Sequence, residues 1–333
     1  MNSVLRGGRK RRRAGSRLLA LLALIAAPAS VATVAYLALW HHESAPRGAA
    51  PTPLAAGAAP GPSARGLSAP IEDTPPVTDV PLNGVDAFRL RMGKPPRAAL
   101  LFDVDTGDVL LRRHPLARLP IASLTKIMTA LIVTERAGPG QRVRITRAAL
   151  RYQGSGVGVL PKGRRVRLET LLNGMLLVSG NDAAIALALQ VAGSQRRFTR
   201  LMNRRARTLG LRCTRFVDPH GLGTANRSCA RDLAVLTRLA MANRRITRIV
   251  RRRQVEFRFP IKGGHVFLSG HNPLIRAGYR GAIGLKTGYT AHAGRCFVGV
   301  ARRRGRTLAV VLLDSPNPLK HAERLLDEGF AHP

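Results

Sequence analysis

The sequence contains few acidic residues and few aromatic residues. Aspartate and glutamate account for 18 of the 333 residues, against 55 lysines and arginines, so the formal net charge is +37. Aromatic residues make up only 4%, which argues against the base-stacking surfaces of many nucleic-acid-binding proteins. The arginines are spread over the whole chain, and no RRM, KH, zinc-finger or helix-turn-helix signature accompanies them. We therefore expect no nucleic-acid partner, and attribute the charge to an arginine-biased composition or to a surface that favours an anionic cell envelope.

Lysine and cysteine are also scarce. Seven of the 55 basic residues are lysines, so an ordinary positive charge in this chain is an arginine, and a lysine in an apolar segment needs an explanation. Cysteine occurs three times, and no cysteine and histidine spacing typical of a metal site is present. We expect neither a metal nor another cofactor.

The N-terminal region divides into three segments. Residues 1–17 are basic and contain no acid, and residues 18–40 contain no charge. As a helix, the second segment would span roughly 35 Å at about 1.5 Å per residue, enough to cross a membrane. We expect residues 1–17 to be cytoplasmic and residues 18–40 to be a transmembrane signal anchor that places the remainder outside. A cleaved signal peptide is the alternative, because "APA" at residues 27–29 resembles a cleavage site.

Residues 41–81 are rich in alanine, proline, glycine and serine, without helical or strand periodicity, and are predicted to be a disordered linker. The folded domain is then expected over residues 82–333. Its beginning, "RAALLFDVDTGDVLLRRH", predicts a hairpin, and "GRCFVGVARRRGRTLAVVLLD" near its end predicts two more strands before a closing helix. The segments between are mostly helical in pattern. This arrangement predicts an α+β domain whose antiparallel sheet joins both ends, with a helical subdomain forming one wall of a cleft.

Three cysteines in an oxidising exterior suggest one disulfide and one free thiol. Cys213 and Cys229 flank a loop short enough to close, and we favour this pair while leaving the unpaired state open. Cys296 is expected in the core.

The segment "PIASLTKIMTAL" places Ser123 and Lys126 on one face of an apolar helix. A lysine on the inward face is desolvated, which lowers its pKa toward that of a usable base and activates a serine hydroxyl. The alternative is an N-capping serine and a lysine whose ammonium group reaches water. Two further tripeptides favour the catalytic interpretation: Ser179-Gly180-Asn181 at a helix break and Lys286-Thr287-Gly288 after a strand-like run. The order S-x-x-K, S-x-N, K-T-G, with spacings of about 55 and 105 residues, is a specific signal.

With these motifs, and with "SGNDAA", "LGLRCTRFVDPHGL", "GHNPL" and "GLKTGYTAHAGRCF" in the same order, the sequence resembles the penicillin-binding protein and serine β-lactamase superfamily. The resemblance covers roughly residues 85–330 and is strongest to the low-molecular-mass D-alanyl-D-alanine carboxypeptidases of the serine peptidase S11 family. It implies the DD-peptidase fold. It also implies an extracytoplasmic enzyme that removes the terminal D-alanine from peptidoglycan stem peptides and is acylated by β-lactams.

The resemblance further implies roles for individual residues. Ser123 is the nucleophile, Lys126 is its base, and Ser179 with Lys286 passes a proton to the departing amine. Asn181 and strand backbone at Gly288 bind the peptide, and the backbone N–H groups of Ser123 and Tyr289 hold the oxyanion. The implied residues are catalytic Ser123, Lys126 and Ser179, and substrate-binding Asn181, Lys286, Thr287, Gly288 and Tyr289.

Two departures from the family pattern are visible. The only glutamate between the second and third motifs is Glu256, without the E-x-x-x-N context of a deacylating β-lactamase glutamate, so rapid β-lactam hydrolysis is not expected. The related carboxypeptidases carry a carboxylate-binding arginine ahead of the closing helix, where this chain has Pro318, and Lys320 is a candidate substitute. A carboxypeptidase is the leading hypothesis. The alternatives are a DD-endopeptidase or β-lactamase of the same fold, or a membrane-tethered scaffold without turnover.

Overall fold

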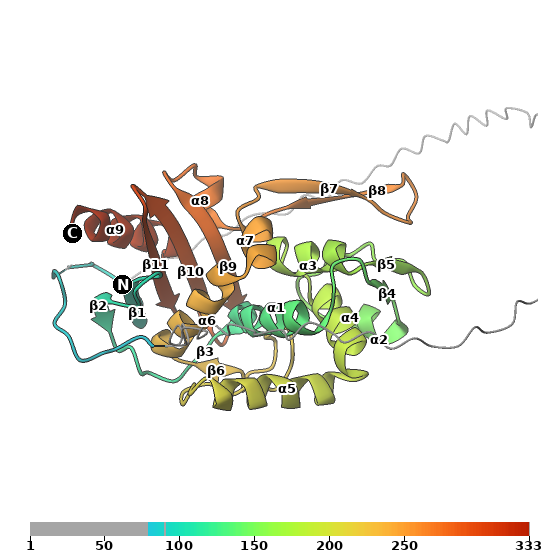
Figure 1. The fold of residues 1–333 in the computed structure, drawn as a ribbon, viewed down its shortest axis with the longest axis horizontal. Helices are drawn as coiled ribbons and strands as arrows, with labels where there is room; N and C mark the ends of the chain where they lie inside the picture. The colour runs from blue at the N-terminus through green and yellow to red at the C-terminus, as the bar shows by residue number, and fades with distance from the viewer. Residues whose placement is uncertain (1–78, 90, 333) are drawn as a thin grey trace, which may run out of the picture. The chain divides into compact units, whose positions relative to one another are not determined.

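The computed structural model describes residues 79–89 and 91–332, which contain a five-stranded antiparallel sheet, on the left in Figure 1. Its strand order is β2-β1-β11-β10-β9, so the first two strands of the sequence pair with the last three. This confirms the predicted α+β architecture. The strands are β1 (Ala98–Asp103), β2 (Val109–Arg113), β9 (Ala282–Thr290), β10 (Gly294–Arg303) and β11 (Arg306–Leu313).

The first hairpin forms where the sequence predicts it. Asp103, at the end of β1, accepts hydrogen bonds from the backbone N–H groups of Asp105 (2.9 Å) and Thr106 (3.2 Å). Gly107 follows with a φ of 93°, a conformation that glycine adopts without a Cβ clash. These local interactions reverse the chain between β1 and β2.

Helices cover both faces of the sheet. Alternate residues of a strand point to opposite faces, and β11 divides its side chains between two apolar layers. Leu308, Val310 and Leu312 pack in the layer that contains Leu325 and Leu326 of α9 (Pro318–Ala331). The intervening side chains enter the larger core with α6 (Ala230–Ala242). Because β11 is buried on both faces, it reads in the sequence as a continuous apolar run rather than an alternating one.

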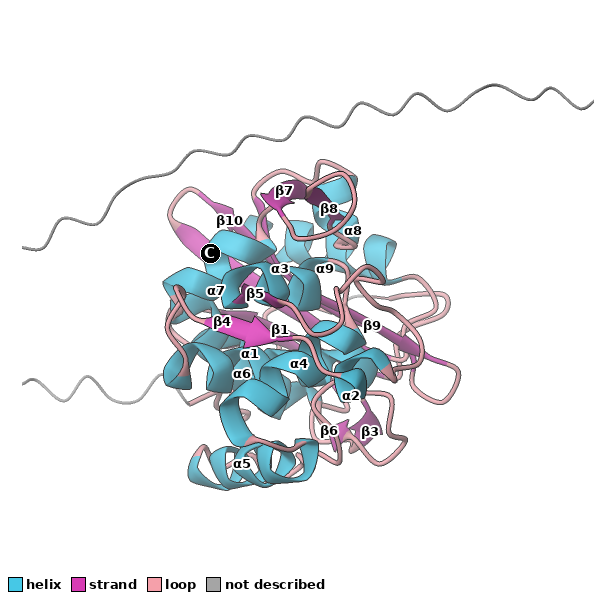
Figure 2. Cartoon of the chain, turned by 90° about the vertical axis from the view of Figure 1, so that its right-hand side faces the viewer, coloured by secondary structure: helices cyan, strands magenta, loops and turns pink. Residues whose placement is uncertain are grey.

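The helical subdomain is built around α4, which packs against α1, α3 and α5. It occupies the green and yellow part of Figure 1, with α5 at its outer edge in both Figure 1 and Figure 2. Its main helices are α1 (Thr125–Arg136), α3 (Leu168–Leu177), α4 (Asn181–Ala192) and α5 (Gln195–Thr208). These four helices and α6 confirm the predicted helical middle of the domain.

Several short elements in this region were not predicted. The most prominent is the β7–β8 hairpin, which extends along the top of Figure 1 above α3. The pairs are β3 (Leu119–Pro120) with β6 (Arg227–Ser228), β4 (Arg142–Arg144) with β5 (Arg165–Arg167), and β7 (Gln254–Arg258) with β8 (His265–Ser269). The short helices are η1 (Ala122–Leu124), α2 (Arg147–Leu150), α7 (Arg244–Val250) and α8 (Pro273–Arg276).

Cys213 and Cys229 form a disulfide with a Cα–Cα distance of 5.6 Å, which confirms the favoured pairing. Cys296 on β10 is a free, buried cysteine, and burial raises the pKa of its thiol to about 12. The thiol therefore stays protonated and behaves as a core group, as predicted.

The predicted cytoplasmic segment 1–17, the predicted anchor 18–40 and most of the predicted linker 41–81 lie outside the described residues. Within residues 79–332, position 90 excepted, none of the helices has both the length and the apolar character that membrane crossing requires. The segment boundaries at 17, 40 and 81 stay predictions.

Candidate active site

Ser123 lies in the 3-10 turn η1, immediately before α1, and Lys126 lies in the first turn of that helix. The Lys126 side chain is fully buried, with 0% exposure. Its Nζ lies 2.9 Å from Ser123 Oγ. The S-x-x-K spacing therefore brings the two groups into hydrogen-bonding contact, because the turn and the helix place positions three apart on one face.

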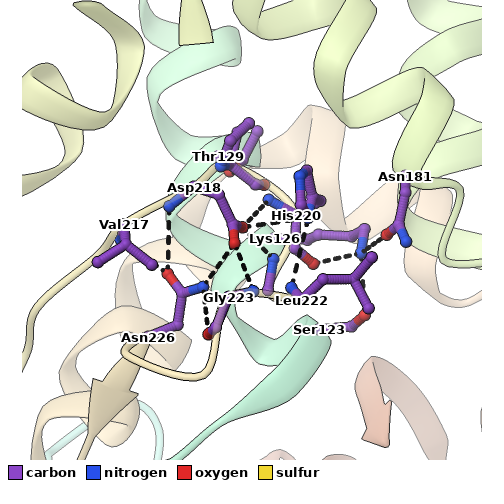
Figure 3. A network of polar contacts seen from close by, with 12 residues as sticks. Ser123, Lys126, Thr129, Asn181, Val217, Asp218, His220, Leu222, Gly223 and Asn226 are labelled. Atoms are coloured by element: carbon purple, nitrogen blue, oxygen red, sulfur yellow. Dashed lines mark hydrogen bonds and ion pairs between the residues drawn. The ribbon is translucent and has the colours of Figure 1, made fainter. Parts of the chain in front are cut away.

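Two more oxygen atoms surround the Lys126 amine (Figure 3). Its Nζ donates to Asn181 Oδ1 at 2.7 Å and to the His220 carbonyl at 2.6 Å. An amide oxygen and a carbonyl oxygen can only accept, whereas the Ser123 hydroxyl can also donate. A neutral amine, with two N–H groups and one lone pair, therefore satisfies all three neighbours when the Ser123 O–H donates to it.

The electrostatic setting favours this neutral form. Burial lowers the pKa of Lys126 well below its usual value, and the nearby charge of Lys286 lowers it further. Asp218 and Asp182 oppose the shift, but their effect is smaller. Burial alone lowers the pKa of Lys286 to about 7. Two buried lysines thus titrate far below the range of a lysine in water.

The "DPHGL" loop holds the His220 carbonyl against Lys126. The Asp218 carboxylate accepts backbone N–H bonds from His220 (2.8 Å), Gly221 (2.5 Å) and Gly223 (2.6 Å). Gly221 has a φ of 94°, and a Cβ there would lie 2.0 Å from the Ala122 carbonyl oxygen. Only glycine allows this approach. His220 was not among the residues predicted for the site, and it contacts the lysine through its carbonyl rather than its imidazole.

Ser179 lies between α3 and α4 with a φ of 61°, a conformation that is rare for a non-glycine residue. Its Oγ accepts a hydrogen bond from Lys286 Nζ at 3.0 Å. Lys286 lies on β9, is buried, and also donates to the Thr287 carbonyl at 2.8 Å. The second and third motifs therefore meet across a strand and a helix break. Backbone strain of this kind accumulates at functional sites.

The carboxamide of Asn181 is oriented from both ends. Its Oδ1 accepts from Lys126, and its Nδ2 donates to the Gln153 carbonyl at 2.6 Å. The following residue, Asp182, is fully buried and accepts from the backbone N–H groups of Val157 and Gly158 at 2.9 and 3.0 Å. These bonds hold the loop over residues 152–158 against the start of α4. One Nδ2 proton of Asn181 is left for another acceptor.

A cavity of about 620 Å³ opens beside these residues. Gly288 contributes bare backbone to its wall, and a Cβ there would lie 3.0 Å from the Ser123 backbone nitrogen. Lys126, Asn181 and Lys286 are buried behind the wall that Ser123 and Ser179 form. The lining residues are Ser123, Ser155, Ser179, His271, Pro273, Thr287, Gly288, Tyr289, Arg295, Cys296, Phe297, Pro316, Asn317, Pro318 and Leu319.

The structure thus brings the seven defined residues of the three motifs to one place, together with Tyr289. Lys320 does not join them: its side chain is exposed on α9, and the turn before it presents Pro318 and Leu319 to the cavity instead. Glu256 is also elsewhere, since it lies on β7 beside His265. Arg295 on β10 lines the cavity and was missed, because nothing in "AGRCF" marks an arginine as part of a site.

The fold belongs to the DD-peptidase class. A solved D-alanyl-D-alanine carboxypeptidase from Mycobacterium tuberculosis H37Rv matches with a TM-score of 0.69 and 34% identity, covering 74% of this chain and 96% of that one. A mutant of the Streptomyces K15 DD-transpeptidase matches with a TM-score of 0.67 and 30% identity, covering 72% of this chain and 100% of that one.

The chain belongs to the Peptidase S11 family, described as D-alanyl-D-alanine carboxypeptidase, which matches over residues 95–317. D-alanyl-D-alanine carboxypeptidase DacB2 of Mycobacterium tuberculosis is 36% identical over 246 residues, which span 71% of this chain and 83% of the relative. DacF of Bacillus subtilis is 32% identical, and its match spans 71% of this chain and 62% of the relative. A D-alanyl-D-alanine endopeptidase of Pseudomonas aeruginosa is 33% identical, over 67% of this chain and 73% of the relative. This chain is a penicillin-binding serine peptidase.

Proposed function

We propose that this enzyme removes the terminal D-alanine from peptidoglycan stem peptides through an acyl-enzyme on Ser123. The observation that carries the proposal is the contact between Ser123 Oγ and the buried amine of Lys126, made at the wall of a cavity large enough for a peptide end. A desolvated lysine flanked by two fixed acceptors has its lone pair directed at the one neighbour that can give up a proton.

In the acylation step, Ser123 Oγ attacks the carbonyl carbon of the penultimate D-alanine while its proton passes to the neutral Lys126 amine. The carbonyl oxygen becomes negative and is held by the backbone N–H groups of Ser123 and Tyr289. One such donor is worth about 3–4 kcal/mol in the transition state. The C–N bond then breaks, and the proton that Lys126 took from Ser123 passes to the leaving amine through the Ser179 hydroxyl, which Lys286 Nζ contacts at 3.0 Å. Lys126 is then neutral again.

In the deacylation step, water attacks the ester carbon, and its proton passes to the Lys126 amine. The C–O bond to Ser123 breaks, and Ser123 Oγ regains a proton from the same amine. The peptide leaves one D-alanine shorter. The catalytic groups end in the protonation states in which they began.

The substrate is bound as an extended strand beside β9. Gly288 lets the peptide backbone approach. The free Nδ2 proton of Asn181 binds a substrate carbonyl. Thr287 binds the terminal carboxylate, and the charge of Lys286 attracts that carboxylate from behind the cavity wall. A requirement for that carboxylate makes the enzyme an exopeptidase.

The test is D-alanine release from a synthetic stem pentapeptide, with Ser123→Ala as the matched control. A cross-linked stem-peptide dimer is assayed in parallel, because some relatives are named endopeptidases. Release from the pentapeptide that disappears in the variant supports the carboxypeptidase function. Cleavage of the dimer alone would assign an endopeptidase instead, and penicillin labelling without release from either substrate would contradict both.

We also propose that residues 82–333 act outside the cytoplasm, held by a membrane anchor at residues 18–40. The uncharged segment after a basic flank supports the anchor. The disulfide between Cys213 and Cys229 supports an oxidising compartment. Protease treatment of intact spheroplasts tests both ideas. Loss of the domain, with the N-terminal segment kept in the membrane, is expected, whereas full protection would place the domain inside.

A further inference from the structure

The cavity has one fully charged side chain among its lining residues. Lys126 and Lys286 are buried behind the wall, and His271 has a pKa that burial lowers. The remaining candidates in the lining are hydroxyl, amide, thiol and apolar groups. Arg295 on β10 is the exception, and it is exposed to the cavity and to solvent.

The strand register places Arg295 on the same face of the sheet as Thr287. In the antiparallel pairing of β10 with β9, Arg295 is opposite Tyr289, and Phe297 is opposite Thr287. Residues directly opposite share a face, and so do residues two apart on one strand. Arg295 and Thr287 are therefore diagonal neighbours, which in a sheet lie about 7–8 Å apart at the backbone. An arginine side chain spans that distance.

The segment before α9 positions the arginine. The Ser315 N–H donates to the Arg295 carbonyl at 2.8 Å, and Arg295 Nη1 donates to the Pro316 carbonyl at 3.2 Å. These two bonds hold the residue by its backbone and by one edge of the guanidinium. The other guanidinium N–H groups have no acceptor among the described residues, and no carboxylate of that part of the chain lies within 4.0 Å of it. Donors of a planar fork are thus left for a ligand.

We propose that Arg295 binds the terminal carboxylate of the substrate together with Thr287 and so determines the specificity for a free C-terminus. The inference rests on the proposed function, because it concerns the same peptide. A guanidinium presents parallel N–H groups that match the two oxygens of a carboxylate. Arg295 reaches the carboxylate subsite from β10, across the strand that carries the K-T-G motif, whereas Lys320 on α9 points into solvent.

The experiment compares two pairs of ligands that differ only in the carboxylate. The first pair is a stem peptide ending in D-Ala-D-Ala and its C-terminal amide, with product release measured as kcat/KM. The second pair is benzylpenicillin and its methyl ester, with the acylation rate measured by intact mass. The variants are Arg295→Gln, Arg295→Lys and, as a matched control, Lys320→Gln.

Arg295→Gln is expected to lower kcat/KM for the free peptide and the acylation rate of benzylpenicillin by about 10- to 100-fold, the range for a lost charge-assisted hydrogen bond. The kcat/KM for the C-terminal amide and the acylation rate of the methyl ester are expected to change less than about threefold. Arg295→Lys retains the positive charge but lacks the planar guanidinium, so its kcat/KM and acylation rate are expected to lie between those of Arg295→Gln and wild type. Lys320→Gln is expected to behave as wild type.

Equal losses on both members of a pair would overturn the proposal, since they would indicate a structural effect. Wild-type values of kcat/KM and of the acylation rate in Arg295→Gln would also overturn the proposal. If the wild type releases no D-alanine from the peptide, the proposed function fails, and the penicillin pair still decides the role of Arg295.

Discussion

The Nζ atom of Lys126 lies 2.9 Å from Ser123 Oγ, while the other two neighbours of that nitrogen are oxygens that can only accept hydrogen bonds. This relationship gives the lysine a defined task. Its two N–H groups are committed to Asn181 and His220, so the lone pair of the neutral amine is directed at the serine hydroxyl. The buried lysine costs folding stability in exchange for a base beside the nucleophile.

Replacing Lys126 tests this task directly. Lys126→Arg retains a positive charge that cannot be given up near neutral pH, and Lys126→Met removes the amine. Both variants are expected to lose about 10²- to 10⁴-fold in the acylation rate, the usual range for a lost general base. Time courses with a fluorescent penicillin measure the rate. The melting temperature of Lys126→Met is expected to be no lower than that of wild type, since the substitution removes a buried amine. If the Lys126→Arg variant were acylated at the wild-type rate, Lys126 would be excluded as the base.

The pH dependence should follow the two lysines. Acylation is expected to fall at low pH, where Lys126 becomes protonated. On the basic side, kcat/KM for a peptide with a free carboxylate is expected to fall as pH rises through about 7, because Lys286, whose pKa is about 7, then loses its charge. In Arg295→Gln, the same rise in pH should lower kcat/KM by a larger factor. The C-terminal amide should lack the decline, and an identical basic limb for both peptides would argue against carboxylate binding by Lys286.

The lowered pKa of Lys286 also predicts how the stability of the protein depends on pH. Its pKa is about 7 in the folded protein against a usual value of 10.5, so the unfolded chain binds more protons between those values. Its contribution to the free energy of unfolding should therefore rise as pH increases from about 7 to about 10.5. Denaturant titrations at several pH values measure this rise. Lys286→Met should reduce it, and an unchanged slope in that variant would contradict the assigned pKa shift.

The Asp218 carboxylate is expected to stabilise the loop that holds the His220 carbonyl. Burial raises the pKa of Asp218, but His220 and the three backbone N–H groups outweigh burial and lower it overall. A depressed carboxyl pKa contributes stability above the unfolded value of 3.8 that is lost as pH falls below it. Asp218→Asn should lower the free energy of unfolding by about 2 kcal/mol at pH 7, and less near pH 3. It should also slow acylation, and normal acylation would show that Lys126 does not depend on the loop.

The disulfide closes a chain segment with a sequence separation of 16 residues. Closing a loop of this length restricts the unfolded chain and stabilises a protein by about 3 kcal/mol. The double variant Cys213→Ser, Cys229→Ser should therefore unfold at lower denaturant concentration than wild type. Dithiothreitol should shift the wild type toward the variant and leave the variant unchanged. Coincident unfolding curves without reductant would contradict a structural disulfide.

Much of this fold could be predicted from local sequence patterns. The β1–β2 hairpin has a turn signal at residues 105–108, and α1, α3 and α4 have broad apolar faces. The β7–β8 hairpin was missed because its exposed face mixes polar residues with Phe267, which is 74% exposed, so the alternation is weak. The β4–β5 strands are three residues each, too short to produce a periodic pattern.

The residues of the site also divide into those that could be predicted from the sequence and those that could not. The motif residues could be found because three short patterns occur in a fixed order. The His220 carbonyl and Arg295 could not, because a backbone oxygen carries no residue signature and an arginine in an arginine-rich chain carries little information. Both depend on tertiary placement. The first needs the Asp218 loop folded under Lys126, and the second needs β10 paired with β9 in its observed register.

The most direct test of the central claim is intact-mass spectrometry after incubation with benzylpenicillin, followed by peptide mapping. Wild type is expected to gain one penicilloyl group, on the peptide that contains Ser123. Ser123→Ala, with an unchanged melting temperature, is expected to gain none. An adduct on another residue, or an adduct of equal yield in the variant, would contradict the account of Ser123 as the nucleophile.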